Sequence, residues 1–210
     1  MKKHKLLYFL LICLLVCNSS CRQQEPAECV DQIEAFDSQL YENDEIGWRI
    51  NIPKNWSLTQ RQKLEELDSE GRNLVKDSTE TELAQPNFLV GFQKDQSNNF
   101  ISTSDPFNEQ TDGEWERHVE ELRVLVGQTY RNQGLNCELS KLEAEEISGL
   151  VFQTFSARID VSNGSIFNQR YYYRPFDGAL FGVAITFNDK ELGAEMLNAW
   201  RTSKFKDTNE

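Results

Sequence analysis

Hydrophobic and polar residues alternate through most of the chain's second half. The segments LVFQTFSARIDV, SIFNQRYYYRPF and ALFGVAITFN follow the two-residue period of half-buried strands. The Asn-Gly pair at 163–164 and the Asp-Gly pair at 177–178 separate them, and both dipeptides favour hairpin turns. A preceding strand, roughly residues 138–147, is expected to turn at Ser148-Gly149. The pattern therefore predicts an antiparallel meander.

The first half of the chain contains three further segments with strand character. Residues 46–56 alternate, with Trp48, Ile50 and Ile52 pointing one way. Residues 87–95 and 100–107 are predicted to form two strands around a polar turn.

Three segments instead show helical spacing. Residues 57–76 are predicted to form a helix with a Thr59/Gln62 capping box. Asp112 is expected to cap the clearest helix, at about 113–132, and Asp189 to cap a closing helix. The expected inward-facing residues are Leu64, Leu67, Leu74 and Val75 in the first, Trp115, Val119, Leu122, Val126 and Tyr130 in the second, and Leu192, Met196 and Trp200 in the third.

The order of these elements indicates the fold class. It runs strand, helix, hairpin, long helix, antiparallel meander and closing helix. Strands joined by tight turns are antiparallel, and amphipathic helices must cover the faces of their sheet. We therefore predict an α+β fold, an α/β/α sandwich with a central antiparallel sheet.

Four stretches resemble a known family. They are GWRINIPKNW, Gly149 after an acidic strand, YYYRPFDGALFGVAITF and LNAWRTSKF. Over most of residues 40–206 they are similar to the PsbP-like, Mog-type domains, which form an α/β/α sandwich. The chain is most similar to the short lipoproteins of Bacteroidetes-type bacteria that carry one such domain. The resemblance implies a non-enzymatic role in binding protein partners or assembling complexes.

The N-terminus has the parts of a secretory signal peptide, predicted to span residues 1–20. Lys2, Lys3 and Lys5 precede an apolar run from Leu6 to Cys17. That run is shorter than the roughly 20 apolar residues that a membrane-spanning helix needs. We therefore expect a cleaved leader rather than a transmembrane anchor.

The end of this leader resembles the lipobox of bacterial lipoproteins. Residues 18–21 read Asn-Ser-Ser-Cys, with an asparagine in place of the usual leucine. The resemblance implies that Cys21 is lipidated and becomes the first mature residue, so that the protein binds a lipid bilayer. We expect residues 21–35 to form the lipidated N-terminus and a tether, and residues 36–210 to form the domain. The alternative is ordinary cleavage near Ser19 or Ser20, which would release a secreted soluble protein.

Charge and cysteine content limit the partners. The chain has 22 basic and 34 acidic residues; removal of residues 1–20 takes away three lysines and no acid, leaving 19 basic residues and a formal charge of −15. Such a chain lacks the basic footprint of nucleic-acid binders, so no nucleic acid is expected as a partner. Cys29 and Cys137 could form a disulfide in an exported protein, or remain as two free thiols.

Catalytic equipment is sparse. His118 is the one histidine after leader removal, and the sequence contains no GxSxG or Walker motif. Glu114 and Glu121 could join His118 around a metal, but a solvated edge histidine is the favoured interpretation. The acids Glu143, Glu145 and Glu146 are interpreted as the exposed face of a strand. No catalytic, metal or cofactor site is predicted, so we expect a protein that is not an enzyme; a carboxylate-only envelope hydrolase directed at glycans is the alternative.

One patch suggests a binding surface. In a strand, Arg170, Tyr172 and Arg174 share one face, and arginine and tyrosine are common interface anchors. Cross-strand packing beneath a helix is the favoured interpretation, and an exposed partner patch is the other. The function predicted from the sequence is a membrane-anchored binding or assembly module that docks an unknown envelope protein. We expect a lipid-anchored location in the cell envelope, at the outer rather than the inner membrane.

Overall fold

The computed structural model of the chain describes residues 7–8, 39–111, 113–161 and 164–206. The predicted lipidation site Cys21, the tether at 21–35 and Cys29 lie outside the described residues. So does the predicted signal peptide, apart from β1 (Leu7–Tyr8), which pairs in parallel with β5 (Leu83–Ala84).

The main sheet has eight antiparallel strands. Seven follow the order β4-β6-β7-β12-β11-β10-β8, and β9 pairs with β10 on the same edge as β8. The alternating segments thus form the predicted antiparallel meander, with β7 paired to β12 at its side. The strands are β4 (Ser57–Leu58), β6 (Phe88–Asp95), β7 (Asn98–Pro106), β8 (Asn136–Leu139), β9 (Glu143–Ile147), β10 (Leu150–Asp160), β11 (Ile166–Phe176) and β12 (Ala179–Phe187).

The strand predicted at 138–147 is two strands, not one. The interruption begins at Ser140, whose backbone N–H donates to the Ser156 carbonyl over 2.9 Å. The Ser156 N–H then donates to the Ser140 hydroxyl, also over 2.9 Å, instead of to a backbone carbonyl. A side-chain acceptor can replace the ladder in this way, and the chain leaves the edge of β10 before rejoining it as β9.

A small second sheet joins the two ends of the domain. Its order is β13-β3-β2, comprising β13 (Lys204–Phe205), β3 (Trp48–Ile52) and β2 (Gln39–Asn43). The alternation predicted for β3 is confirmed, since Trp48, Ile50 and Ile52 are each at most 2% exposed. The segment TSKF, after the closing helix, supplies β13.

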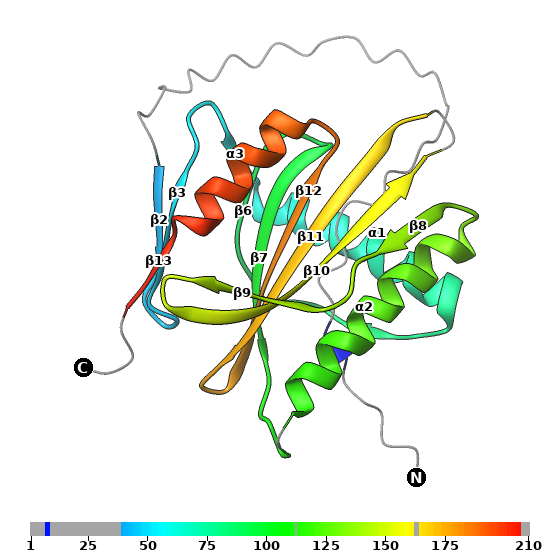
Figure 1. The fold of residues 1–210 in the computed structure, drawn as a ribbon, viewed down its shortest axis with the longest axis horizontal. Coiled ribbons are helices and arrows are strands. Elements are labelled where there is room, and N and C mark those ends of the chain that lie inside the picture. Colours follow the sequence, from blue (N-terminus) through cyan, green and yellow to red (C-terminus); the bar gives the residue numbers. More distant parts are fainter. Residues whose placement is uncertain (1–6, 9–38, 112, 162–163, 207–210) are drawn as a thin grey trace.

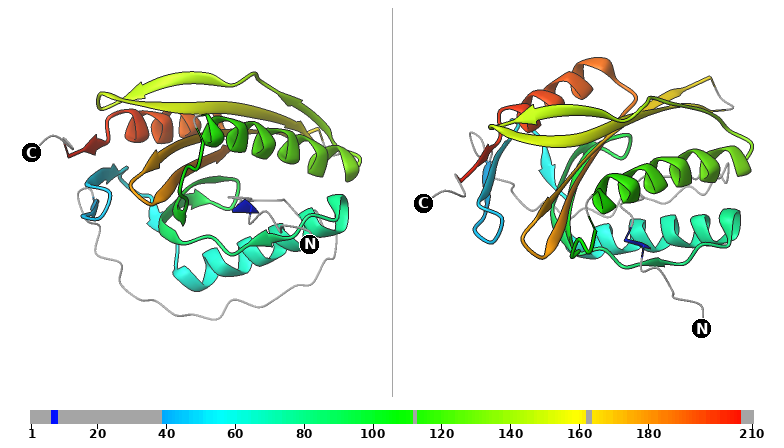
Figure 2. Two further views of the ribbon diagram at one scale, coloured as in Figure 1. Left: turned by 90° about the horizontal axis from the view of Figure 1, so that it is seen from below. Right: turned by 60° about the horizontal axis from the view of Figure 1, so that its bottom comes forward.

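Three helices complete the sandwich. They are α1 (Arg61–Thr79), α2 (Glu114–Asn132) and α3 (Lys190–Arg201). Helices α1 and α2 pack on one face of the main sheet, whereas α3 and the small sheet pack on the other (Figures 1 and 2). The predicted α/β/α architecture is confirmed. Within the described residues, no helix combines the length and apolar character needed to cross a bilayer.

Of the three predicted helix caps, one is confirmed, one is wrong and one involves a residue outside the described ranges. Asp189 caps α3 as predicted, because its side chain accepts the N–H groups of Glu191 and Leu192. The Thr59/Gln62 capping box of α1 is wrong: Thr59 still follows β4, with its N–H bonded to the Gly91 carbonyl at 2.8 Å. Gly113 occupies the N-cap position of α2, and Asp112 lies outside the described residues.

An aromatic cluster fills the core beneath α3. Trp48 and Trp200 are essentially unexposed, and their ring centroids lie 6.2 Å apart. Phe152 contacts Trp200 at 5.2 Å, and Phe181 contacts Trp48 at 5.0 Å. Phe205 of β13 contacts both tryptophans. The small sheet, α3 and the main sheet therefore share one continuous core.

Candidate functional site

A row of polar side chains lies on the α3 side of the main sheet, toward the edge formed by β8. On β10, the period of two alternates buried residues facing α2 with Ser156 and Arg158, which are half-buried on the other side. On β11, Asn168 pairs with Arg158 and Arg170 pairs with Ser156. We call this row, with Glu138 and Ser140, the polar face.

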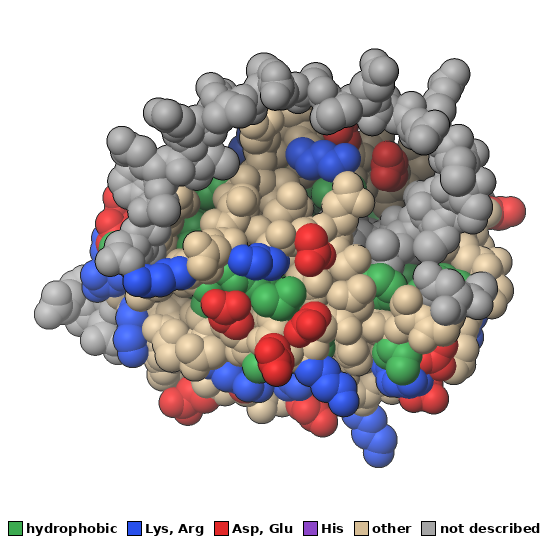
Figure 3. Space-filling view, turned by 90° about the horizontal axis from the view of Figure 1, so that it is seen from above, with side chains coloured by type: hydrophobic (Ala, Val, Ile, Leu, Met, Phe, Trp, Pro, Cys, Tyr) green, Lys and Arg blue, Asp and Glu red, His purple; other side chains and the backbone are tan. Residues whose placement is uncertain are grey.

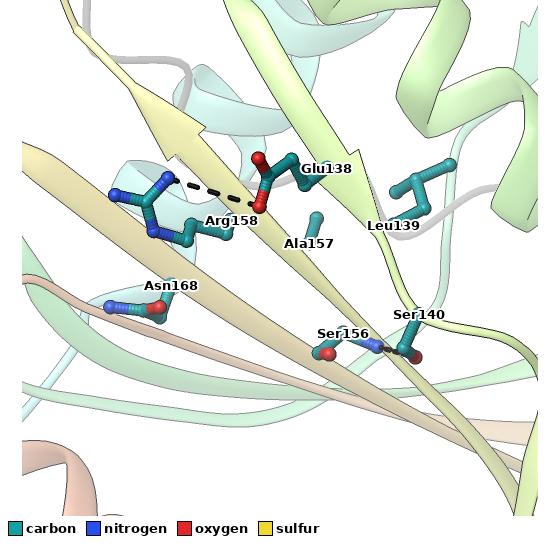
Figure 4. Close-up of a pocket in the computed structure, with 7 residues that line it drawn as sticks. All are labelled: Glu138, Leu139, Ser140, Ser156, Ala157, Arg158 and Asn168. Atoms are coloured by element: carbon teal, nitrogen blue, oxygen red, sulfur yellow. Dashed lines mark hydrogen bonds and ion pairs between the residues drawn. The ribbon is translucent and has the colours of Figure 1, made fainter.

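The polar face surrounds a hollow of about 220 Å³. Figure 4 shows its lining, with Arg158 reaching toward Glu138 at 3.9 Å. A second ion pair joins Arg158 to Asp160 at 2.7 Å. The lining residues are Glu138, Leu139, Ser140, Ser156, Ala157, Arg158 and Asn168. A hollow lined by hydroxyl, amide and ion-paired groups can exchange hydrogen bonds with a polar ligand or partner.

Next to the hollow, one carboxylate joins three elements. Glu145 of β9 accepts a hydrogen bond from Nε of Arg201 in α3 at 2.7 Å. Its other oxygen accepts from Arg170 at 3.0 Å and from the Tyr172 hydroxyl at 3.1 Å, both on β11. These four residues are called the Glu145 cluster, and together they fasten α3 to the sheet.

The protonation states of the cluster suit a structural role. Burial acts to raise the Glu145 pKa, but the hydrogen bond from Arg201 and the charges of Arg201 and Arg170 outweigh it, so the pKa is lowered. Burial raises the pKa of Tyr172 to about 12. At neutral pH Glu145 is therefore ionised and Tyr172 protonated, and neither pKa lies near the value expected of a general acid or base.

The predicted patch of Arg170, Tyr172 and Arg174 is divided between core and surface. Tyr172 is unexposed beneath α3, with its ring 5.3 Å from that of Trp200. Arg170 lies over the Tyr172 ring at 5.6 Å, and Arg174 donates to the Val151 carbonyl at 2.7 Å. Tyr172 thus has no exposed ring to offer, whereas the two arginines stay half-buried. A partner role for this patch stays a prediction.

The other predicted site residues lie apart from the polar face. Cys137 is buried on β8, and burial raises the pKa of its thiol. Because Cys29 lies outside the described residues, their pairing stays a prediction. His118 packs on Phe107 at 5.8 Å, and the Glu114 carboxylate accepts the Gln110 N–H at the start of α2. In the described ranges, no three His, Cys, Asp or Glu residues are grouped to hold a metal.

Sequence reasoning missed the role of Glu145. Glu143 and Glu146 are exposed, as interpreted, but the Glu145 side chain is only 20% exposed. The role of Glu145 could have been predicted from the two-residue period of the strand. Once β9 is paired with the meander, this period places Glu145 on the same face as Arg170 and Tyr172. Arg201 could not be found in this way, because its approach depends on how α3 packs.

Replacing Glu145 with glutamine is expected to lower the free energy of unfolding by about 1–2 kcal/mol at neutral pH. The amide cannot balance the charges of Arg170 and Arg201. Since the Glu145 pKa is lowered in the folded state, its contribution is present above the unfolded value of 4.5 and is lost as the pH falls through the folded pKa. Urea unfolding at pH 7 and at pH 3 measures this difference.

Glu146→Gln provides a matched control on the neighbouring, exposed position. We expect it to change the free energy of unfolding by less than about 0.5 kcal/mol. Equal losses in the two variants, or a Glu145→Gln loss that is undiminished at pH 3, would contradict the assigned role.

Comparison with known proteins supports the fold. No protein-family model and no curated protein sequence matches the chain. Among solved structures, PsbP (CyanoP) from Synechocystis sp. PCC 6803 aligns with a TM-score of 0.56 and 14% identity, covering 86% of this chain and 98% of that one. LpqN, involved in cell envelope biogenesis in Mycobacterium tuberculosis, aligns with a TM-score of 0.43 and 12% identity, covering 81% and 91%. The first of these shows that the chain has a PsbP-like fold.

Proposed function

We propose that this protein is a lipid-anchored, non-enzymatic binding or assembly module of a bacterial cell envelope. The observation that carries the binding role is the polar face, where polar side chains surround a hollow on the sheet. The fold places this face beside α3, and the Glu145 cluster holds it in shape.

The anchor in this proposal is Cys21, at the end of the predicted leader. Acyl chains contribute about 0.8 kcal/mol per buried methylene, and two or more chains hold a protein firmly to a membrane. Residues 22–35 would then separate the domain from the bilayer. The lipid bilayer is thus the first partner, at the outer rather than the inner membrane.

The second partner is an envelope protein that contacts the polar face. Acidic and basic side chains are interleaved on the side of the molecule seen in Figure 3. On the polar face, Arg158 lies between the carboxylates of Glu138 and Asp160. A partner that offers both charges and hydrogen-bonding groups matches such a surface better than a uniformly charged polymer does.

The hydrolase alternative needs two facing carboxylates with room for a sugar. Among the described residues that line the hollow, Glu138 is the carboxylate, and Arg158 pairs with it. Because no second acid faces Glu138 in that lining, the geometry favours binding over glycan hydrolysis.

Capture from detergent-solubilised membranes tests the proposed partner. The full-length protein is expected to recover one stoichiometric envelope protein, identified by mass spectrometry. A double variant of the polar face, Arg158→Glu with Asn168→Arg, should lose it by reversing the charge and filling the hollow. Arg61→Glu, an exposed change on the far side of the sheet in α1, is the matched control and should retain the partner.

Two results would contradict this proposal. One is capture of the same partner by the polar-face variant at the wild-type level. The other is reproducible hydrolysis of an envelope glycan by the wild-type protein, lost in Glu138→Gln.

A further inference from the structure

The buried stripe of α1 contains a carboxylate. Leu64 and Val75 are buried as predicted, but Asp68 and Gly71 complete the stripe, whereas the predicted Leu67 and Leu74 are half-buried. Asp68 is 1% exposed. Its Oδ2 accepts from Nε of Arg72 at 2.7 Å, and its Oδ1 is buried with no hydrogen-bond partner among the described residues. A carboxylate in this position is costly unless something compensates for its charge.

A second carboxylate lies on the sheet that α1 covers. Asp105, near the end of β7, is 5% exposed. One of its oxygens accepts the Asn87 N–H at 2.8 Å, and the other accepts the Thr103 hydroxyl at 3.1 Å. Asp105 thus ties the start of β6 to β7, on the face where Asp68 lies.

Tyr173 brings a third ionisable group to this place. It lies on β11, is 3% exposed, and its ring rests against Gly182 of β12. A Cβ at Gly182 would lie 3.0 Å from Cε1 of Tyr173 and 3.4 Å from the Thr103 hydroxyl. The glycine therefore lets the ring extend across β12 toward β7, where the Tyr173 hydroxyl is buried without a partner in the described structure.

These groups oppose one another's ionisation. Burial raises the pKa of Asp105 to about 6; its two hydrogen bonds act against this, and the charge of Asp68 adds to it. Burial also raises the Asp68 pKa, against the pull of Arg72. The Tyr173 pKa is raised by burial and by the charge of Asp105.

We propose that Asp68, Asp105 and Tyr173 form an internal proton-binding site that fastens α1 to the sheet in mildly acidic conditions and loosens this contact when the proton leaves. Oδ1 of Asp68 and the Tyr173 hydroxyl are buried with no hydrogen-bond partner in the described structure. The Tyr173 ring and Thr103, which donates to Asp105, both lie beside Gly182. When the site is deprotonated, Asp68 and Asp105 are both charged and buried between α1 and the sheet, and Arg72 pairs with Asp68 alone.

Two basic residues of α1 near the site make contacts with other groups. Arg61 of α1 donates to the Phe88 carbonyl at 3.4 Å, and Lys76 pairs with Glu82 at the end of the same helix. His118 of α2, the one histidine among the described residues, packs on Phe107 just beyond β7.

The direction of the effect follows from linkage. The folded state holds the Asp105 proton up to a pH of about 6, whereas the unfolded chain loses it near 3.8. Between these values the folded state binds more protons, so stability falls as the pH rises. The stabilising contribution is therefore complete at acidic pH and is lost as the pH passes through about 6.

Hydrogen exchange of the full chain at pH 5 and pH 7.5, corrected for intrinsic rates, tests the proposal. The opening equilibrium of α1 amides is expected to rise about tenfold at the higher pH, while α3 amides change little. Asp105→Asn keeps an acceptor for the Asn87 N–H and removes the charge, so the pH difference should disappear. Asp77→Asn, at an exposed position of α1, is the matched control and should retain it.

Two outcomes would overturn the inference. The first is a pH difference that survives in Asp105→Asn but disappears in His118→Gln, which would assign the proton to the histidine. The second needs no variant: a carbon-13 titration in which the Asp105 carboxyl has a midpoint near 4. A midpoint near 6, with the Asp68 signal moving in the same step, supports the shared site.

Discussion

Replacing Cys21 with alanine is expected to move the protein from the membrane fraction to the soluble fraction. In the proposed lipoprotein, this thiol carries the acyl chains, and no other part of the chain is assigned to the bilayer. Each lost methylene removes about 0.8 kcal/mol of membrane affinity, so loss of the chains should release essentially all of the protein. Fractionation and incorporation of radiolabelled palmitate measure the two effects together.

Cys29→Ala is the control, since it removes a second cysteine from the same segment. It should keep both the label and the membrane location. Label that survives in Cys21→Ala would place the lipid elsewhere. A wild-type protein that is soluble and unlabelled would favour ordinary cleavage and a secreted binding protein.

Replacing Trp200 with alanine is expected to cost about 3–5 kcal/mol of unfolding free energy. Trp200 is unexposed, and its ring contacts those of Trp48, Phe152 and Tyr172 within 6.2 Å. Truncation leaves a cavity between the small sheet, α3 and the main sheet. The surrounding aromatic rings are rigid and cannot move to fill it. Urea unfolding followed by far-ultraviolet circular dichroism avoids a readout that depends on tryptophan itself.

Leu197→Ala tests whether this loss is specific to the aromatic cluster. Leu197 is half-buried on the same helix, and its truncation should cost about 1 kcal/mol. Trp200→Phe should lie between the two, because the Trp200 Nε1 has no hydrogen-bond partner in the described structure to lose. A Trp200→Ala loss no larger than that of Leu197→Ala would show that the cluster repacks.

Strand positions were predictable because a period of two is local. Trp48, Ile50 and Ile52 face the core as their alternation indicates, and the meander follows from its turn dipeptides. The capping box at Thr59 failed because strand pairing with β6 extends through that residue. The local capping motif does not form because a hydrogen bond to a residue distant in the chain is made instead. A local sequence pattern cannot reveal such a bond.

The polar clusters were less predictable than the fold. An acidic residue in an amphipathic helix is ordinarily assigned to the solvent-facing side. That rule would place Asp68 in solvent, but in the structure its side chain is buried. Its burial depends on how α1 packs against the sheet and α2, which come from distant parts of the chain. Similarly, Tyr172 alternates with its neighbours as expected, but only the packing of α3 decides that its ring is covered.

The pairing of β13 with β3 has a consequence for how the chain acquires its structure. Phe205 contacts Trp48 and Trp200, so the aromatic cluster is incomplete until the segment after α3 is present. In a polypeptide that emerges N-terminus first, from a ribosome or a translocation channel, β3 can pair with β2 but lacks its second neighbour, β13, until the last segment emerges. Because the small sheet is completed last, the chain can pass through a channel unfolded. We expect the need for chaperones to be greatest before β13 has paired with β3.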